Sequence, residues 1–302
     1  MSGIRILTPV AITDAQLVSS SVPEADHAAW SAATAYAVGD RVIRTGVHKI
    51  YQRLVAGTTA AAPESHAVAW VEVGPTNRWG MFDDVNNSAT TSATTLSVVL
   101  APGRLIAGIA ALGVVGKSIR FRVSHPTLGI VYDQTRGLDG VITQPNWYNY
   151  FTDAVSPFSQ FVALGLITYS PASQVWVDIE PVDGVASISN LVVGPQAVYG
   201  SGIEYGARVG IIDYSRKVTN DFGNTVLVKR NYAKRAEITL WMPRASTDPL
   251  IAKLAALRAT PALYSVSDLY EATNLFGFYR DFSVVLSYPD TDVLSLQIEG
   301  LT

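Results

Sequence analysis

The chain has 302 residues, of which 48% are hydrophobic and 16% charged, with a net charge of −3 at pH 7 and no cysteine. This length and apolar content predict a globular protein of two or three domains. The absence of cysteine excludes a disulfide framework and a thiolate zinc site, and the small negative charge gives no overall field that would attract nucleic acid. The longest apolar run, residues 105–115, is much shorter than the roughly 18 to 20 residues that cross a bilayer. We therefore expect no transmembrane segment, and no secretory signal is visible at the N-terminus.

The first 27 residues predict a short strand and a polar leash. Residues 4–11 alternate loosely between apolar and polar side chains, and a Ser-rich passage follows that ends at Pro23. This segment leads into the first compact unit of the chain.

A small β-module is predicted over residues 28–78. Turn residues at 36–40 precede a strand at Arg41–Arg44, and Gly46 makes a hairpin turn into a second strand at 49–54. A module of this size is near the lower limit for an independent core, so we expect it to depend on large rings.

The rings, turn residues and strand residues that characterise the module are Trp30, Tyr36, Gly39, Asp40, Val42, Gly46, Tyr51 and Trp70. Through these residues the module resembles the type 5/12 carbohydrate-binding (chitin-binding) modules. The resemblance implies a sugar site, because sugar rings stack on exposed aromatic faces, and the candidate residues are Trp30, Tyr36, Tyr51 and Trp70. Where chitin-binding members carry a pair of exposed aromatics after the second strand, this chain has RLVAG at 53–57. That departure favours the alternative, a scaffold module whose rings form its core.

Residues 79–200 show an all-β pattern. The clearest strands are expected at 95–100, 117–124, 129–133, 161–168, 174–180 and 188–193. In 117–124 and 174–180 apolar and polar residues alternate, so that one face of each strand is buried and the other is solvated. Half-buried strands at this spacing predict a β-sandwich or jelly roll.

Within this domain, four aromatic residues lie in the loop 144–151, QPNWYNYF. Trp147, Tyr148 and Tyr150 are candidates for a second sugar-stacking platform. The alternatives are that these rings close the open end of the sandwich or face a neighbouring subunit.

Positive charge is concentrated in residues 208–235, which we call the basic seam. It holds seven basic and two acidic residues, a local charge of +5, so the other parts of the chain carry −8. Like charges repel one another on an isolated surface, whereas opposite charge elsewhere offers partners when copies or domains meet. We expect an assembly interface formed by Arg216, Lys217, Arg230 and Arg235; the alternative is a solvated connector.

The last domain, 201–302, is predicted to be α+β, with one helix on a sheet. Asp248 is expected as the helix N-cap with Pro249 at the first helical position, and the helix is expected to end before Pro261. Its apolar side chains recur on one face at Leu250, Leu254 and Leu257. Strands are expected at 235–242, 262–267, 275–288 and 293–301.

Several longer motifs occur in the chain: NRWGMFDD (77–84), GIIDYSRKVTNDFG (210–223), YAKR (232–235), LRATP (257–261), LFGFYRDFSV (275–284) and IEGL (298–301). Through them the chain resembles tail-tip or baseplate proteins of the Mu-like siphophage group of tailed bacteriophages. The resemblance implies a virion component at the distal end of the tail, made in the host cytoplasm. It also implies a homo-oligomeric ring or spike that joins other tail and baseplate proteins and contacts the cell envelope.

No constellation with the spacing of a catalytic or metal centre is present. The four histidines have no carboxylate or second histidine at ligand spacing. Asp178 and Glu180 share one face of a strand, which does not place an acid and a base on opposite sides of a glycosidic bond. Asp83 and Asp84 are interpreted as capping or salt-bridging groups at a domain junction rather than as calcium ligands. The sequence thus predicts no enzyme, metal or cofactor, but a structural and binding protein. The resemblance of the longer motifs implies that it is a structural component of a phage tail tip, with a carbohydrate-binding adhesin as the alternative.

Overall fold

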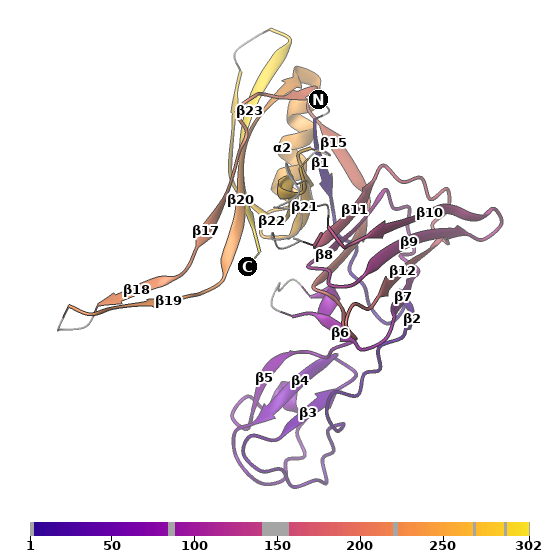
Figure 1. Cartoon of the computed structure of the whole chain (residues 1–302), viewed down its shortest axis with the longest axis vertical. Helices are drawn as coiled ribbons and strands as arrows, with labels where there is room; N and C mark the ends of the chain where they lie inside the picture. The colour runs from indigo at the N-terminus through magenta and orange to yellow at the C-terminus, as the bar shows by residue number, and fades with distance from the viewer. Residues whose placement is uncertain are drawn as a thin grey trace, which may run out of the picture.

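The computed structural model describes residues 3–83, 88–140, 157–219, 223–267, 270–286 and 289–301. The protein is mainly β, as predicted, and consists of a small module, a sandwich and a large sheet that carries one helix and a projecting arm (Figure 1).

Eight strands form the large sheet, which we call the C-terminal sheet. In order they are β15 (Gln196–Tyr199), β1 (Ile4–Leu7), β21 (Ala262–Ser265), β22 (Asn274–Val285), β23 (Thr291–Gly300), β20 (Tyr232–Pro243) and β16 (Gly202–Ile203), with β17 (Arg208–Asp213) also paired to β20. The predicted N-terminal strand is therefore β1, and it lies between two strands that follow it by more than 180 residues in the chain.

One helix, α2 (Thr247–Ala256), covers one face of this sheet, as the apolar spacing predicted. Leu250 and Leu254 are fully buried in a core that includes Ile238, Leu240 and Leu296 of the strands beneath. The leucine stripe therefore fixes which face of the helix meets the sheet.

The predicted N-cap of this helix was wrong. A 3-10 turn, η3 (Arg244–Ser246), leads directly into the helix, so that Ser246 already has helical backbone angles and Asp248 lies within the first turn. The hydroxyl of Thr247 donates to Asp292 on β23 at 2.5 Å. This buried bond ties the start of the helix to the sheet.

The sandwich consists of two facing sheets and a small edge pair. The five-stranded sheet has the order β10 (Gly129–Gly137), β9 (Ser118–His125), β12 (Gln174–Glu180), β7 (Leu96–Leu100) and β2 (Leu17–Ser20). The three-stranded sheet has the order β11 (Gln160–Leu164), β8 (Gly108–Leu112) and β14 (Asn190–Gly194). The edge pair consists of β13 (Ala186–Ile188) and β6 (Thr90–Ser92). Their inner faces share one core, in which Phe121, Ile179 and Ile109 are fully buried. The chain passes between the layers at most of its connections, as in jelly rolls, so the predicted sandwich is confirmed.

Two predicted strands of the sandwich have different limits. The strand expected at 161–168 ends at Leu164, because Gly165 has a positive φ of 76° that extended backbone does not allow. The strand expected at 188–193 is divided into β13 and β14 around Ser189.

The three-stranded sheet is buried on both faces. Its second face packs on the C-terminal sheet through a separate apolar cluster of Leu7, Ala110, Val192, Leu263 and Phe276. The protein body therefore has four layers: the helix, the C-terminal sheet, the three-stranded sheet and the five-stranded sheet.

The sandwich and the segment after β1 can approach each other closely because residue 194, at the end of β14, is a glycine. A Cβ atom on Gly194 would lie 1.9 Å from the backbone oxygen of Thr8, which follows β1. No side chain fits there unless the backbone moves.

We predict that Gly194→Ala destabilises the protein by roughly 1 to 3 kcal/mol, because overpacking forces the backbone apart. Denaturant unfolding measures the change. Gly46→Ala is the matched control, since a Cβ there meets nothing within 4 Å, and its effect should stay within about 0.5 kcal/mol. Equal stability of the two variants would contradict the close packing of these segments.

The basic seam forms a hairpin that leaves the body of the protein. Beyond the paired strands β17 and β20 it continues as a two-stranded ribbon, β18 (Arg216–Thr219) and β19 (Thr225–Val228). Figure 1 shows the described parts of this hairpin, residues 208–219 and 223–235, projecting away from both the sandwich and the small module. We call it the arm.

Candidate functional site

The small module is a three-stranded sheet, β3 (Arg41–Arg44), β4 (Lys49–Arg53) and β5 (Trp70–Pro75), built around aromatic rings. Trp70 is only 2% exposed and Tyr51 is 5% exposed. The guanidinium of Arg53, itself buried, lies 4.8 Å from the centre of the Trp70 ring and donates to Thr59 at 3.1 Å. These two candidate sugar-binding rings therefore form the core of the module.

The other two candidate rings are partly buried at the same core. Tyr36 meets Trp70 edge to face, with ring centres 5.2 Å apart, and its hydroxyl accepts the amide of Ser31 at 2.8 Å. Trp30 carries the guanidinium of Arg44 at 4.9 Å from its ring centre. Both rings are therefore engaged in contacts within the module, unlike the exposed rings of a stacking platform.

A shallow depression of about 420 Å³ lies beside this core, and two ion pairs flank it. Arg44 binds Glu64 through two hydrogen bonds of 3.1 and 2.7 Å, which keep the pKa of that carboxyl below its ordinary value. Lys49 pairs with Glu72 at 2.7 Å. Tyr51 also lines the depression, and burial raises the pKa of its hydroxyl.

The aromatic loop that contains Trp147, Tyr148 and Tyr150 lies outside the described residues. Its predicted role as a stacking platform, a plug or a subunit contact stays a prediction.

We predict that Trp70→Ala unfolds the small module, because losing a buried Trp costs about 3 to 5 kcal/mol, close to the whole stability of a domain of this size. Hydrogen exchange of the β3 to β5 amides in the full chain measures this loss. Val71→Ala, on the exposed face of β5, should leave their protection unchanged. Normal protection in Trp70→Ala would show that the ring is a surface feature.

Each face of the outer ribbon of the arm has its own character. Cross-strand partners share a face, and Val218 is opposite Val226 while Arg216 is opposite Val228. One face thus carries three valines and one arginine. The other carries Lys217 opposite Leu227, beside a pair of threonines.

The described residues of this ribbon are all exposed, including its apolar side chains. Leu227 is 77% exposed and Val226 61%. Further large side chains are exposed along the root of the arm: Val209, Ile211, Tyr214 and Tyr232. Exposed apolar side chains grouped in this way mark an interaction surface.

Three of the four predicted interface cations lie together where the outer ribbon begins. Arg216 and Lys217 start β18, and the backbone amide of Arg230 donates at 3.0 Å to the hydroxyl of Ser215, which immediately precedes β18. Arg235 is apart from them, in the inner pair opposite Gly210. Among the described residues, no ion pair of the protein involves any of these four side chains.

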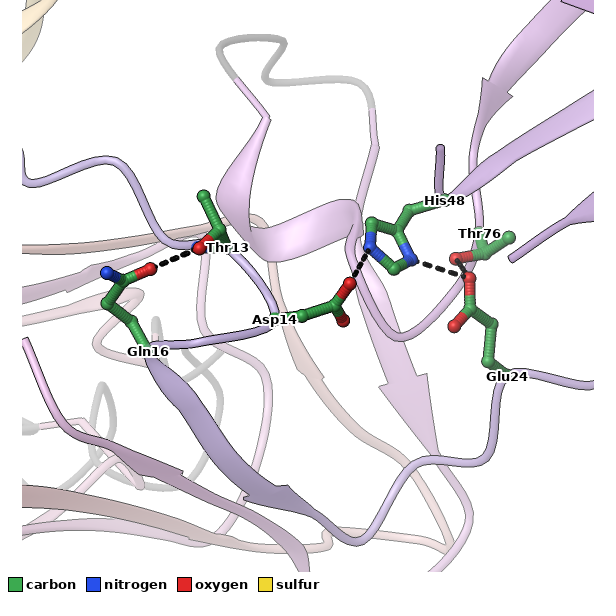
Figure 2. A network of polar contacts seen from close by, with 6 residues as sticks. All are labelled: Thr13, Asp14, Gln16, Glu24, His48 and Thr76. Carbon is green, nitrogen blue, oxygen red and sulfur yellow. Dashed lines mark hydrogen bonds and ion pairs between the residues drawn. The ribbon is translucent and has the colours of Figure 1, made fainter. Parts of the chain in front are cut away.

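A polar network joins the module to the rest of the chain and was not predicted. The ring of His48, in the turn before β4, has Nδ1 at 3.1 Å from Glu24 and Nε2 at 3.2 Å from Asp14 (Figure 2). Glu24 also accepts the hydroxyl of Thr76 at 2.9 Å. His48 stacks on Trp79, with ring centres 3.9 Å apart.

The carboxylates that the sequence singled out have structural partners. Asp178 pairs with Arg122 at 2.6 Å, and Glu180 accepts the Ser118 hydroxyl at 3.0 Å. Asp83 accepts the hydroxyl of Ser88 at 2.6 Å, and Asp84 lies outside the described residues. In the described part of the chain, no three His, Asp or Glu side chains are grouped as metal ligands, and no helix there is long and apolar enough to span a bilayer.

No protein-family model matches the chain, and no curated protein matches it significantly. The family resemblances of the module and of the longer motifs therefore stay predictions.

Proposed function

We propose that the protein is a structural component of a bacteriophage tail tip or baseplate, which assembles with further copies of itself and with other tail proteins through the arm. In this role it is located in the virion, at the distal end of the tail. The four-layered body acts as the building unit, and the small module decorates its surface.

The observation that carries this proposal is the exposed arm. A two-stranded ribbon is only marginally stable in water by itself, and this one exposes Val218, Val226, Leu227 and Val228 on its two faces. Burial on a partner removes this apolar surface from water, which stabilises by roughly 25 cal/mol per Å². The ribbon extends away from its own body, so the partner is another molecule.

Charge supports a second copy of the chain as that partner. The basic seam carries +5 and the remaining residues −8, so the arm of one copy is attracted to the body of the next. Such contacts steer encounter and fix register more than they add affinity. They also weaken as salt screens them.

We predict that the double substitution Arg216→Glu and Arg230→Glu leaves the chain folded but monomeric, while the unchanged protein forms oligomers. Sedimentation velocity over a range of protein concentrations measures this difference. The matched control is Arg104→Glu with Arg258→Glu, which reverses two exposed cations outside the arm and should still assemble. Oligomers of the arm variant that match those of the unchanged protein would contradict the proposal.

A second candidate function, recognition of a surface glycan, is supported by the depression beside the module core. Its Glu64 and Glu72 carboxylates and the Tyr51 hydroxyl are groups that hydrogen-bond sugar hydroxyls. We expect the full chain to bind a glycan array weakly, and Glu72→Gln to abolish the signal while Arg41→Gln, outside the depression, keeps it. Binding that both variants retain would assign glycan recognition to another part of the chain.

A further inference from the structure

We propose that His48 is a pH-dependent latch that holds the small module against the sandwich in mildly acidic solution and releases it as the pH rises. The latch joins the β3–β4 turn of the module to the N-terminal leash that carries Asp14 and Glu24 (Figure 2). The same ring also contacts the connection that carries Trp79.

The geometry of the two carboxylates requires two hydrogen-bond donors on one ring. Glu24 faces Nδ1 and Asp14 faces Nε2, at 3.1 and 3.2 Å. An imidazolium donates from both nitrogens, whereas a neutral imidazole has one N–H and one lone pair. When the ring loses its proton, one carboxylate therefore faces a lone pair at hydrogen-bonding distance, and an attractive contact becomes a repulsive one.

His48 is the side chain that can supply positive charge to the carboxylates of this cluster. Among the described residues, the ion pairs of Asp14 and Glu24 are with His48. A third carboxylate of the leash, Asp26, accepts the backbone amide of Asn77 at 2.8 Å.

The cationic side chains of the adjoining elements are engaged elsewhere. Arg78 donates from Nε to the backbone oxygen of Val22 at 2.8 Å. On the module strands, Lys49 pairs with Glu72 and Arg44 with Glu64. The charge that balances the leash carboxylates thus comes from the His48 ring.

The stacked indole links this charge to the body of the protein. The His48 and Trp79 rings are nearly parallel, with 20° between their planes, and a cation over an indole face is attracted to it. Trp79 is buried and meets Phe82 edge to face at 5.6 Å, and Phe82 packs on the sandwich core. Loss of the ring charge therefore weakens the contacts to the leash and to the sandwich together.

The direction of the pH dependence follows from the protonation states in which the His48 ring and the two carboxylates attract each other. The latch needs a protonated imidazole and ionised carboxylates, because only this combination places a hydrogen-bond donor opposite each carboxylate. The stabilisation is therefore present while the ring carries its proton, and it is lost as the pH rises and the ring gives that proton up. The module stays attached in the neutral form, but the His48 contact no longer fixes its position.

The absence of native cysteine allows a direct test with two spin labels. One label is placed at Val38→Cys on the module and the other at Leu128→Cys on the sandwich, both at exposed positions. We expect a narrow distribution of label-to-label distances at about pH 5.5 and a broad one at about pH 8. The ratio of latched to open molecules should be about tenfold lower at the higher pH, as expected for the loss of one charge-assisted hydrogen bond.

The variant His48→Gln should give the broad distribution at both pH values, since its amide carries no charge. His66→Gln, elsewhere in the module, should behave like the unchanged protein. The ¹⁵N shifts of the His48 ring in the unmutated chain provide a second readout, and both nitrogens should be protonated at the acidic pH. A distribution that does not change with pH, a His48→Gln variant that still responds to pH, or a neutral His48 ring at the acidic pH would each overturn the proposal.

Discussion

The pairing of the N-terminal strand with two strands from the C-terminal half is the contact on which the rest of the structure depends. β1 is bonded to β15 on one side and to β21 on the other, with Ile6 opposite both Ala197 and Tyr264. Its alternating side chains enter two cores: Ile4 and Ile6 face the helix side, and Leu7 joins the cluster against the sandwich. β15 follows directly on β14 of the sandwich. The pairing of β1 with β15 therefore connects the sandwich to the C-terminal sheet.

The way in which the arm is held at its root supports the proposal that copies assemble through it. β20 spans 12 residues and is held in the sheet by β23 along Arg235–Pro243, whereas the ribbon strands β18 and β19 pair with each other. The root of the arm is anchored, with the Tyr214 hydroxyl donating to Glu299 at 2.8 Å. The arm therefore has a fixed direction but an exposed outer part, which reduces the ordering entropy that binding must overcome.

The fold could be predicted from the sequence where periodicity reports one buried face. Residues 117–124 and 174–180 alternate cleanly and became β9 and β12, and the leucine spacing of α2 identified its buried side. β8 was not predicted, because a strand buried on both faces has no alternation and reads as a plain apolar run. The partners of β1 could not be predicted either, since strand pairing over such separations leaves no local pattern.

The candidate sites, like the fold, could be predicted from the sequence only in part. Charge counting identified the cations of the arm, but only the register of β18 and β19 shows that three valines share a face with Arg216. The rings of the module were recognised by spacing, while their burial depends on the closure of its sheet around Trp70. His48 gave no signal, because Glu24 and Asp14 are 24 and 34 residues away in the chain.

The central claim, that the arm is the surface through which copies assemble, is tested most directly by hydrogen exchange of the backbone amides of residues 208–232 in assembled and dilute protein. The account predicts slow exchange of the ribbon amides in the assembly and fast exchange in the monomer, with the amides of β9 and β12 equally protected in both. Fast exchange of the ribbon within a stable assembly would contradict it, because the arm would then be solvated while another surface joins the copies.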